Sequence, residues 1–182
     1  MKSTRDLTDE HESIMAFLAI LETILSNIQS EKKVNLEDLQ WLFEFNRDFI
    51  LKGHCDKESC VFFPALESMA IPPESIDFLV AEHEIAWTIA KTMRGLIQDY
   101  IEGRSDIKGD IISLGTGYVD FLKEHILNEE KILFPLVDES IPIDMDERLA
   151  FKFRLFIEER LGIGRYQDLQ ELLSYFKMFY DI

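Results

Sequence analysis

The chain contains four histidines, His11, His54, His83 and His125, and they form two pairs with almost the same spacing. The interval from His11 to His54 is within one residue of the interval from His83 to His125. Imidazole nitrogen is among the commonest protein ligands of transition metals. The repeated histidines therefore predict metal chemistry that is shared between two halves of the chain.

The second histidine of each pair begins a motif that occurs twice. Glu58 and Glu129 each stand four residues after a histidine, and Phe-Pro pairs end the two motifs at Pro64 and Pro135. Residues four apart on an α-helix differ by about 400° of turn and about 6 Å of rise, so their side chains project from the same face. The spacing predicts one His-Glu pair of metal ligands in each half.

Apolar side chains at intervals of three and four predict two helices in the first half. The first covers about residues 8–29, with Thr8 as its expected N-cap. The second follows Asn35, another expected N-cap, and ends near Pro64 because proline interrupts a helix. Both histidines of this half fall on the apolar stripe and are predicted to point into the core.

The second half repeats this arrangement. A third helix is expected to begin at Pro72-Pro73 and to continue to Ile101, and a fourth follows the polar turn at 102–105 and ends near Pro135. Gly115 and Gly117 lie within the fourth helix and indicate either a late helix start or a close contact with a neighbour. The histidines again lie in register with the apolar stripe.

Two helical hairpins, 8–66 and 74–137, are thus related as an internal repeat. With short connections they predict an all-α fold, an up-down-up-down four-helix bundle over residues 1–140 whose histidines and glutamates converge on the axis. The remaining residues, 141–182, predict two further helices separated by Leu161-Gly162-Ile163-Gly164. This C-terminal helical hairpin is expected to pack beside the bundle.

Composition narrows the classes of function. The net charge of −16 argues against nucleic acid and anionic membrane surfaces as partners, because both attract basic proteins. The longest uninterrupted apolar run, Ile14 to Leu21, is too short to span a bilayer, and the polar residues before it do not form a signal peptide. We therefore expect no membrane partner.

Two cysteines do not make a disulfide framework. On one helix Cys55 and Cys60 would have splayed Cα atoms about 8 Å apart, outside bridging range. A reducing, cytoplasmic setting is the expectation that follows. Cys55 is expected to be a packed or surface thiol rather than a ligand, and Cys60 a core residue.

The pattern from His11 to Pro135 resembles that of the hemerythrin-like, or HHE cation-binding, family: a lone His, a His-x-x-x-Glu before Phe-Pro, a second lone His and a second His-x-x-x-Glu-Glu. The second half is the closer match, with Glu129-Glu130-Lys131-Ile132-Leu133-Phe134-Pro135 intact. The first half departs at Ser59 and Cys60, where the family often carries acidic residues.

The resemblance implies a non-haem centre of two iron ions bridged by carboxylates and an oxo or hydroxo group. Glu58 and Glu129 would bridge, and the terminal ligands would be His11, His54, His83 and His125. Trp87 stands where oxygen carriers of the family have a fifth histidine. The set of four His and two Glu looks more like relatives that repair iron centres after nitrosative or oxidative damage, or that sense iron or oxygen.

Several functions remain open at this stage. The chain is expected to bind or sense O2, NO, peroxide or iron itself, while the alternatives are a redox enzyme that turns over NO or peroxide, an iron donor for repair of iron-sulfur centres, and a purely structural metal bundle. No Glu-x-x-His or His-Glu-x-x-His is present, which argues against ferritin-like and zinc-protease sites. A homodimer through the C-terminal helices is also expected.

Further polar residues lie near the expected ligands. Glu10, Glu12, Glu82 and Glu84 flank the lone histidines, where they either orient a ligand or are solvated surface charges. Tyr118 precedes His125 by about two helical turns and is expected to fill the bundle core rather than to bond in the site.

Overall fold

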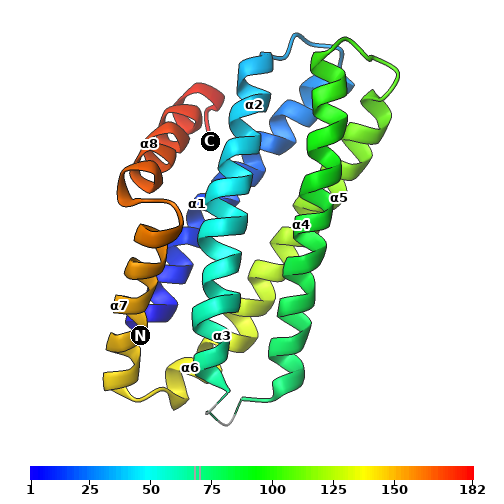
Figure 1. The fold of residues 1–182 in the computed structure, drawn as a ribbon. Coiled ribbons are helices and arrows are strands. Elements are labelled where there is room, and N and C mark those ends of the chain that lie inside the picture. The colour runs from blue at the N-terminus through cyan, green and yellow to red at the C-terminus, as the bar shows by residue number, and fades with distance from the viewer. Residues whose placement is uncertain (68, 70) are drawn as a thin grey trace.

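A computed structural model describes residues 1–67, 69 and 71–182, and all regular elements within them are helical. Four long segments run up and down to form a bundle (Figure 1). The predicted fold class, an all-α up-down-up-down four-helix bundle, is therefore confirmed. The segments are α1 (Lys2–Gln29); α2 (Leu36–Phe45) with η1 (Asn46–Cys55), η2 (Glu58–Phe62) and α3 (Phe63–Leu66); α4 (Pro73–Ile101); and α5 (Lys108–Asn128) with η3 (Glu129–Leu133) and α6 (Phe134–Ser140).

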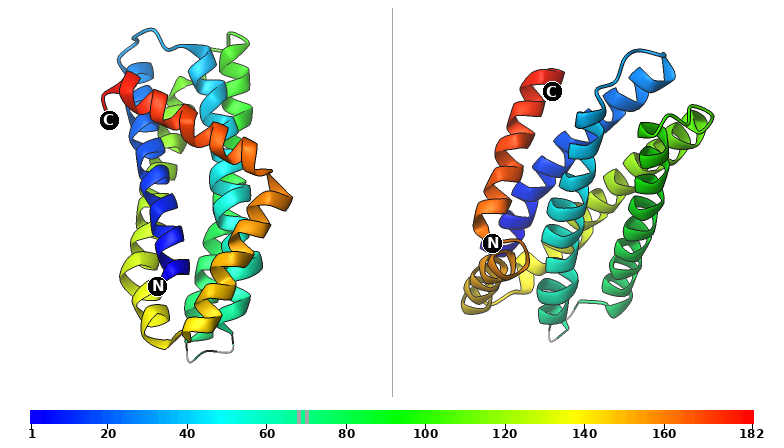
Figure 2. Two further views of the ribbon diagram at one scale, coloured as in Figure 1. Left: turned by 90° about the vertical axis from the view of Figure 1, so that its left-hand side faces the viewer. Right: turned by 45° about the horizontal axis from the view of Figure 1, so that its top comes forward.

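Two more helices follow the bundle, α7 (Ile143–Arg160) and α8 (Ile163–Tyr180). They lie along the side of the molecule that is formed by α1, and both contact it (Figures 1 and 2). Gly162 at the turn between them has a φ of 79°, a left-handed conformation that glycine adopts without strain. We call α7 and α8 the C-terminal hairpin; the division of the chain at residue 140 stays a prediction.

The first helix begins six residues earlier than its sequence pattern predicted, at Lys2 rather than near Thr8. Asp146 of α7 explains the difference, because its carboxylate accepts the backbone N–H groups of Lys2 and Ser3, each at 2.9 Å. A carboxylate from another helix thus satisfies N–H groups that a local cap would otherwise serve. Thr8 lies inside the helix, where its hydroxyl donates to the carbonyl of Thr4.

Asn35 does cap α2, since its side chain accepts the backbone N–H of Glu37. The first hairpin ends at Leu66 as predicted, two residues after Pro64, whereas helical structure in the second continues to Ser140, three residues beyond the predicted limit of 137. Each proline follows a short π-helical stretch, η2 or η3, which begins at the glutamate of the motif. The wider π turn accommodates a residue that lacks an N–H and crowds the preceding turn.

Gly115 marks a close contact between helices and not a late helix start, because α5 begins well before it. A Cβ atom at this position would lie 2.7 Å from the Cδ1 atom of Leu25 in α1. Gly117 has open space around it. The absence of a side chain at residue 115 therefore lets α1 and α5 approach each other.

Two hydrophobic clusters fill the bundle, one at each end of the histidine level. The larger cluster contains Ile14 of α1 and Ala86 of α4, whereas the smaller contains Leu7 and Leu79 of the same helices. Helix α1 is long and apolar enough by composition to cross a membrane, a property that it shares with core helices of bundles. Here its apolar side chains pack in these clusters, with His11 between them.

Candidate metal centre

Six predicted ligands come together in one buried layer between the two hydrophobic clusters. We call them the metal layer and divide them into two overlapping groups, in each of which the ligand atoms lie within 4.8 Å of one another. The first position consists of His11, His54, Glu58 and Glu129, and the second position consists of Glu58, His83, His125 and Glu129. Both glutamates belong to both positions, as the predicted bridging role requires.

The histidine nitrogens are spaced as ligands of one ion would be. The Nε2 atoms of His11 and His54 lie 3.2 Å apart, and those of His83 and His125 lie 3.1 Å apart. Two nitrogens bonded to one first-row ion at about 2.1 Å and at right angles would be separated by about 3.0 Å. Each histidine pair is therefore spaced as two ligands of one bound ion would be.

The two glutamate carboxylates give the clearest sign of a cation site. Glu58 and Glu129 are fully buried, and none of their four oxygens has a hydrogen-bond partner among the described residues. Glu58 Oε2 lies 3.3 Å from His54 Nε2 and 3.4 Å from His83 Nε2, so it faces both positions. Buried carboxylates that accept no hydrogen bond are costly, and coordination of cations is a usual way to stabilise them.

The outward-facing nitrogens of two histidines are held by carboxylates. His54 Nδ1 donates to Glu10 Oε2 at 2.8 Å, and His125 Nδ1 donates to Glu82 Oε2 at 2.8 Å. A proton on Nδ1 leaves the lone pair on Nε2, which is the atom that faces the metal position. Glu10 and Glu82 thus orient predicted ligands. This agrees with the first of the two alternatives given for them above, and not with a role as solvated surface charges.

The two remaining histidines have unlike partners. His11 Nδ1 donates to Glu130 Oε1 at 3.0 Å, whereas His83 Nδ1 lies 2.8 Å from the hydroxyl oxygen of Ser59. Ser59 and Glu130 follow directly after the two bridging glutamates, so they occupy equivalent places in the repeat. A carboxylate makes the histidine that it binds more basic than a neutral hydroxyl does.

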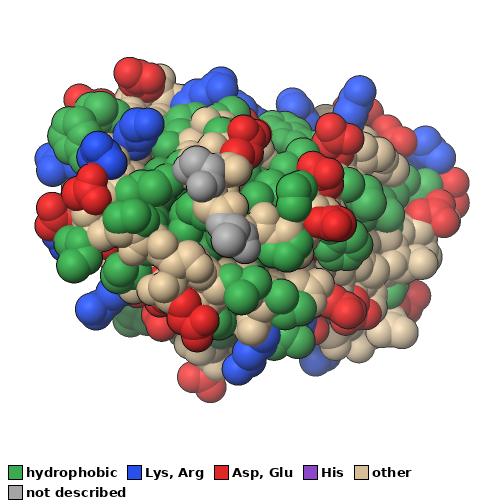
Figure 3. All heavy atoms as spheres, turned by 90° about the horizontal axis from the view of Figure 1, so that it is seen from below, with side chains coloured by type: hydrophobic (Ala, Val, Ile, Leu, Met, Phe, Trp, Pro, Cys, Tyr) green, Lys and Arg blue, Asp and Glu red, His purple; other side chains and the backbone are tan. Residues whose placement is uncertain are grey.

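Phenylalanine rings of the two Phe-Pro pairs close the layer. Phe134 stacks on His11 with ring centres 5.5 Å apart, and Phe63 stacks on His83 at 5.6 Å. Each lone histidine is therefore covered by the motif of the other half. No histidine is visible on the lower end of the molecule, where hydrophobic side chains alternate with acidic ones (Figure 3).

A buried lysine and a distant tyrosine join the network around Glu10. Lys57 Nζ donates to Glu10 Oε1 at 2.5 Å, and the Tyr166 hydroxyl donates to the same oxygen at 2.8 Å. Lys57 is 1% exposed. Burial alone would raise the pKa of Glu10, but Lys57 and His54 outweigh it and lower that pKa to about 2. Glu10 is therefore an ionised partner of His54.

The layer attracts positive charge through its carboxylates. Burial lowers the pKa of His125, but Glu129 and Glu82 outweigh this and raise it to about 9. Burial is likewise outweighed at Glu58, whose pKa the histidines His54 and His83 hold well below its ordinary value. A layer that holds protons this strongly without metal is suited to divalent cations, which release those protons on binding.

Other residues singled out in the sequence lie outside the metal layer. Cys55 is a buried free thiol whose pKa burial raises, and Cys60 is exposed, so its predicted place in the core is wrong. Cys60 stands two residues after Glu58 in η2, so its side chain points away from the layer. Tyr118 is buried and donates to Asn46 at 2.8 Å. Glu12 and Glu84 are exposed.

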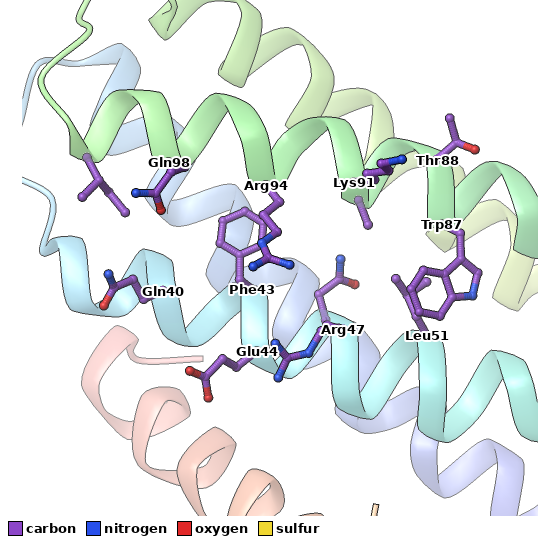
Figure 4. A pocket seen from close by; sticks show the side chains of 13 residues that line it. Gln40, Phe43, Glu44, Arg47, Leu51, Trp87, Thr88, Lys91, Arg94 and Gln98 are labelled. Atoms are coloured by element: carbon purple, nitrogen blue, oxygen red, sulfur yellow. The ribbon is translucent and has the colours of Figure 1, made fainter. Parts of the chain in front are cut away.

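A groove of about 700 Å³ opens between α2, η1 and α4 (Figure 4). None of the six ligands lines it, so it is separate from the metal layer. Trp87 lies at one end of the groove, beside residues that are not among the six predicted ligands. The side chain four residues after His83 thus lines this groove.

Sequence reasoning missed Lys57 and Tyr166 altogether. Their roles depend on contacts that no periodic pattern records, since Tyr166 lies on α8, far along the chain from Glu10. The one available signal for Lys57 was its place next to Glu58, whose side chain was predicted to face the core. Such a lysine, if buried, requires a carboxylate nearby.

Comparison with protein families agrees with this geometry. Residues 2–137 match the model of the hemerythrin HHE cation-binding domain. The chain belongs to this family and is a metal-binding protein, with the matched region covering nearly all of the bundle and ending before the C-terminal hairpin. Searches of curated proteins and of solved structures gave no significant match.

Proposed function

We propose that the chain is a non-haem di-iron protein that binds or senses a small ligand such as O2, NO or peroxide. The observation that carries this proposal is the pair of buried carboxylates, Glu58 and Glu129, whose oxygens face two histidine pairs and accept no hydrogen bond from the described residues. Imidazole and carboxylate together suit iron. Iron bound there would supply Lewis acidity and one-electron redox chemistry.

The surroundings of the metal layer favour a small ligand. Its histidines are at most 4% exposed, and Phe63 and Phe134 stack against two of them. Apolar clusters adjoin the layer on both sides, which favours a diatomic molecule or peroxide over a larger organic substrate. The free thiol of Cys60 at the surface supports a reducing, cytoplasmic setting.

The deciding experiment is anaerobic metal analysis followed by optical spectra before and after addition of O2 and then NO. Two iron ions per chain and new absorption bands with either gas are the expected result. Zinc, or iron that responds to neither gas, would overturn the proposal in favour of a structural or storage role.

The same preparation separates binding from turnover. Bands that reverse when the gas is removed, without loss of gas, support binding or sensing in a stress response. Catalytic consumption of NO or peroxide instead supports a redox enzyme. Transfer of iron to an apo iron-sulfur protein would identify an iron donor.

We also propose that the chain forms a homodimer through the C-terminal hairpin. Five large apolar side chains are more than half exposed there: Ile143 and Phe151 on α7, and Tyr175, Met178 and Phe179 on α8. Light scattering of Phe179→Ser tests the proposal, with Phe78→Ser on α4 as a control of similar exposure. A dimer that survives both substitutions would exclude this face as the interface.

A further inference from the structure

The C-terminal hairpin reaches a predicted metal ligand through only two hydrogen bonds. Tyr166 of α8 donates to Glu10 Oε1 at 2.8 Å, and the other oxygen of Glu10 accepts from His54 Nδ1 at 2.8 Å. Glu10 and His54 are both within the region that matches the family, and Tyr166 lies outside it. The hairpin therefore adds a contact that the bundle alone does not contain.

Lys57 connects the other helix of the hairpin to the same carboxylate. Its ammonium group donates to Glu10 Oε1 at 2.5 Å and lies 5.0 Å from the ring centre of Phe153 on α7. A buried ammonium needs both a counter-charge and a wall that excludes water, and here Glu10 and Phe153 provide them. Both helices of the hairpin thus enclose the Lys57–Glu10 pair.

The second position has no such support. Glu82 bonds to His125 at 2.8 Å and makes no other hydrogen bond or ion pair with the part of the chain that the structure describes. The residue before the bridging glutamate, Lys57 in the first half, is Asn128 in the second half. The outer contacts of the two metal positions therefore differ, although their ligand sets are the same.

We infer that Tyr166 and Lys57 are positioning residues for the first metal position, and that the C-terminal hairpin thereby makes the two positions unequal in metal affinity. They act by fixing Glu10, which fixes the ring orientation and tautomer of His54. Outer partners of metal-bound histidines typically change metal affinity by about 10- to 100-fold when they are lost. This inference rests on the proposed di-metal function.

The test is a titration of the metal-free full chain with Zn²⁺ against a competing chelator. The variants are Tyr166→Phe and Lys57→Met. In the wild-type protein we expect two binding steps. Lys57→Met should weaken one step by about 10- to 100-fold, and Tyr166→Phe, one bond further from the metal, by about tenfold or less, with the other step unchanged.

A matched control exists on the same helix. Tyr180 of α8 donates to Asp38 of α2 at 2.6 Å, far along the helix from the metal layer, so Tyr180→Phe removes an equivalent hydrogen bond between the hairpin and the bundle. If Tyr166→Phe and Tyr180→Phe weaken Zn²⁺ binding equally or not at all, the inference is wrong. If the wild-type protein binds fewer than two ions, the proposed di-metal function itself fails.

Nuclear magnetic resonance of the four histidine rings gives a readout that needs no metal. We expect Tyr166→Phe to shift the Nδ1–H signal of His54 and to leave that of His125 unchanged, whereas Tyr180→Phe should move neither. Zn²⁺ added in small amounts then shows which pair of rings binds the tighter ion. An unmoved His54 signal in Tyr166→Phe would contradict the positioning role even where Lys57→Met fails to fold.

Discussion

The two halves of the bundle agree at the metal layer and differ immediately outside it. In each half a histidine and a glutamate four residues apart face the centre. The Nδ1 atom of that histidine donates to a glutamate on the preceding long helix, Glu10 in the first half and Glu82 in the second. Outside this core, the first half has Lys57 and Ser59 where the second half has Asn128 and Glu130.

The comparison shows which contacts the bundle itself determines. The inner ligands follow from helix periodicity and from the repeat, so they are nearly two-fold symmetric. The outer contacts depend on single residues and on the C-terminal hairpin, which packs along α1 only on one side of the bundle (Figure 2). Differences in metal affinity between the two positions should therefore arise from outer contacts.

The largest effect is expected from the residues that both positions share. Glu58→Gln together with Glu129→Gln should reduce metal content from two ions per chain to near zero, because both bridges are lost. Elemental analysis after loading measures this. Glu12→Gln together with Glu84→Gln, an equal charge change at exposed sites, is the control and should retain both ions. Two ions in the first double variant would exclude the bridging role.

Glu10→Gln and Glu82→Gln test the halves against each other. Glu10→Gln leaves the buried ammonium of Lys57 without its counter-charge, so we expect the free energy of unfolding of the metal-free protein to fall by about 3 kcal/mol or more. Glu82→Gln weakens one hydrogen bond and should cost about 1 kcal/mol. Urea denaturation measures both. Equal losses would show that the Lys57–Glu10 pair contributes little.

Metal affinity should rise with pH between about 6.5 and 9. His125 has a pKa raised to about 9 in the folded, metal-free protein, so below that pH a proton competes with the metal. The same raised pKa stabilises the metal-free fold fully below the ordinary value of 6.5, and this contribution is lost as the pH rises through 9. Chelator competition and thermal melts at several pH values measure both trends. A metal affinity independent of pH would contradict the assignment.

The smallest effect is expected from exchanging Ser59 and Glu130. Ser59→Glu should strengthen the second position by about tenfold or less, because His83 gains a carboxylate partner, and Glu130→Ser should weaken the first by a similar factor. Stepwise Zn²⁺ affinities measure the change. If both single variants keep the Zn²⁺ affinities of the wild-type protein, these outer partners do not distinguish the positions.

The clustering of the six predicted ligands could be foreseen from the sequence because their spacing is encoded locally. His54 and Glu58 share a helix face, and His11 and His83 lie on apolar stripes, so periodicity alone placed them in the core. What the sequence did not predict depends on distant contacts. Asp146 of α7 accepts a backbone N–H at the start of α1, and Tyr166 of α8 donates a hydrogen bond to Glu10.

Helix ends were the other point of failure. Helices were expected to end near Pro64 and Pro135, but the π-helical turns before these prolines let helical structure continue past them, by two residues in the first half and by five in the second. Cys60 was placed in the core although its angle from Glu58 turns it to solvent. A spacing rule gives the face of a helix more reliably than it gives the residue where that helix ends.

Each half of the bundle supplies a phenylalanine that covers a histidine of the other half, and this arrangement affects how the two metal positions can come to differ. Phe134 covers His11 and Phe63 covers His83, so one hairpin alone cannot enclose a metal position, and two identical hairpins would make two identical positions. Because both hairpins are here in one polypeptide, a substitution at residue 59 changes one position and leaves residue 130 as it was. Covalent linkage of the repeats would allow two bound ions to take different tasks.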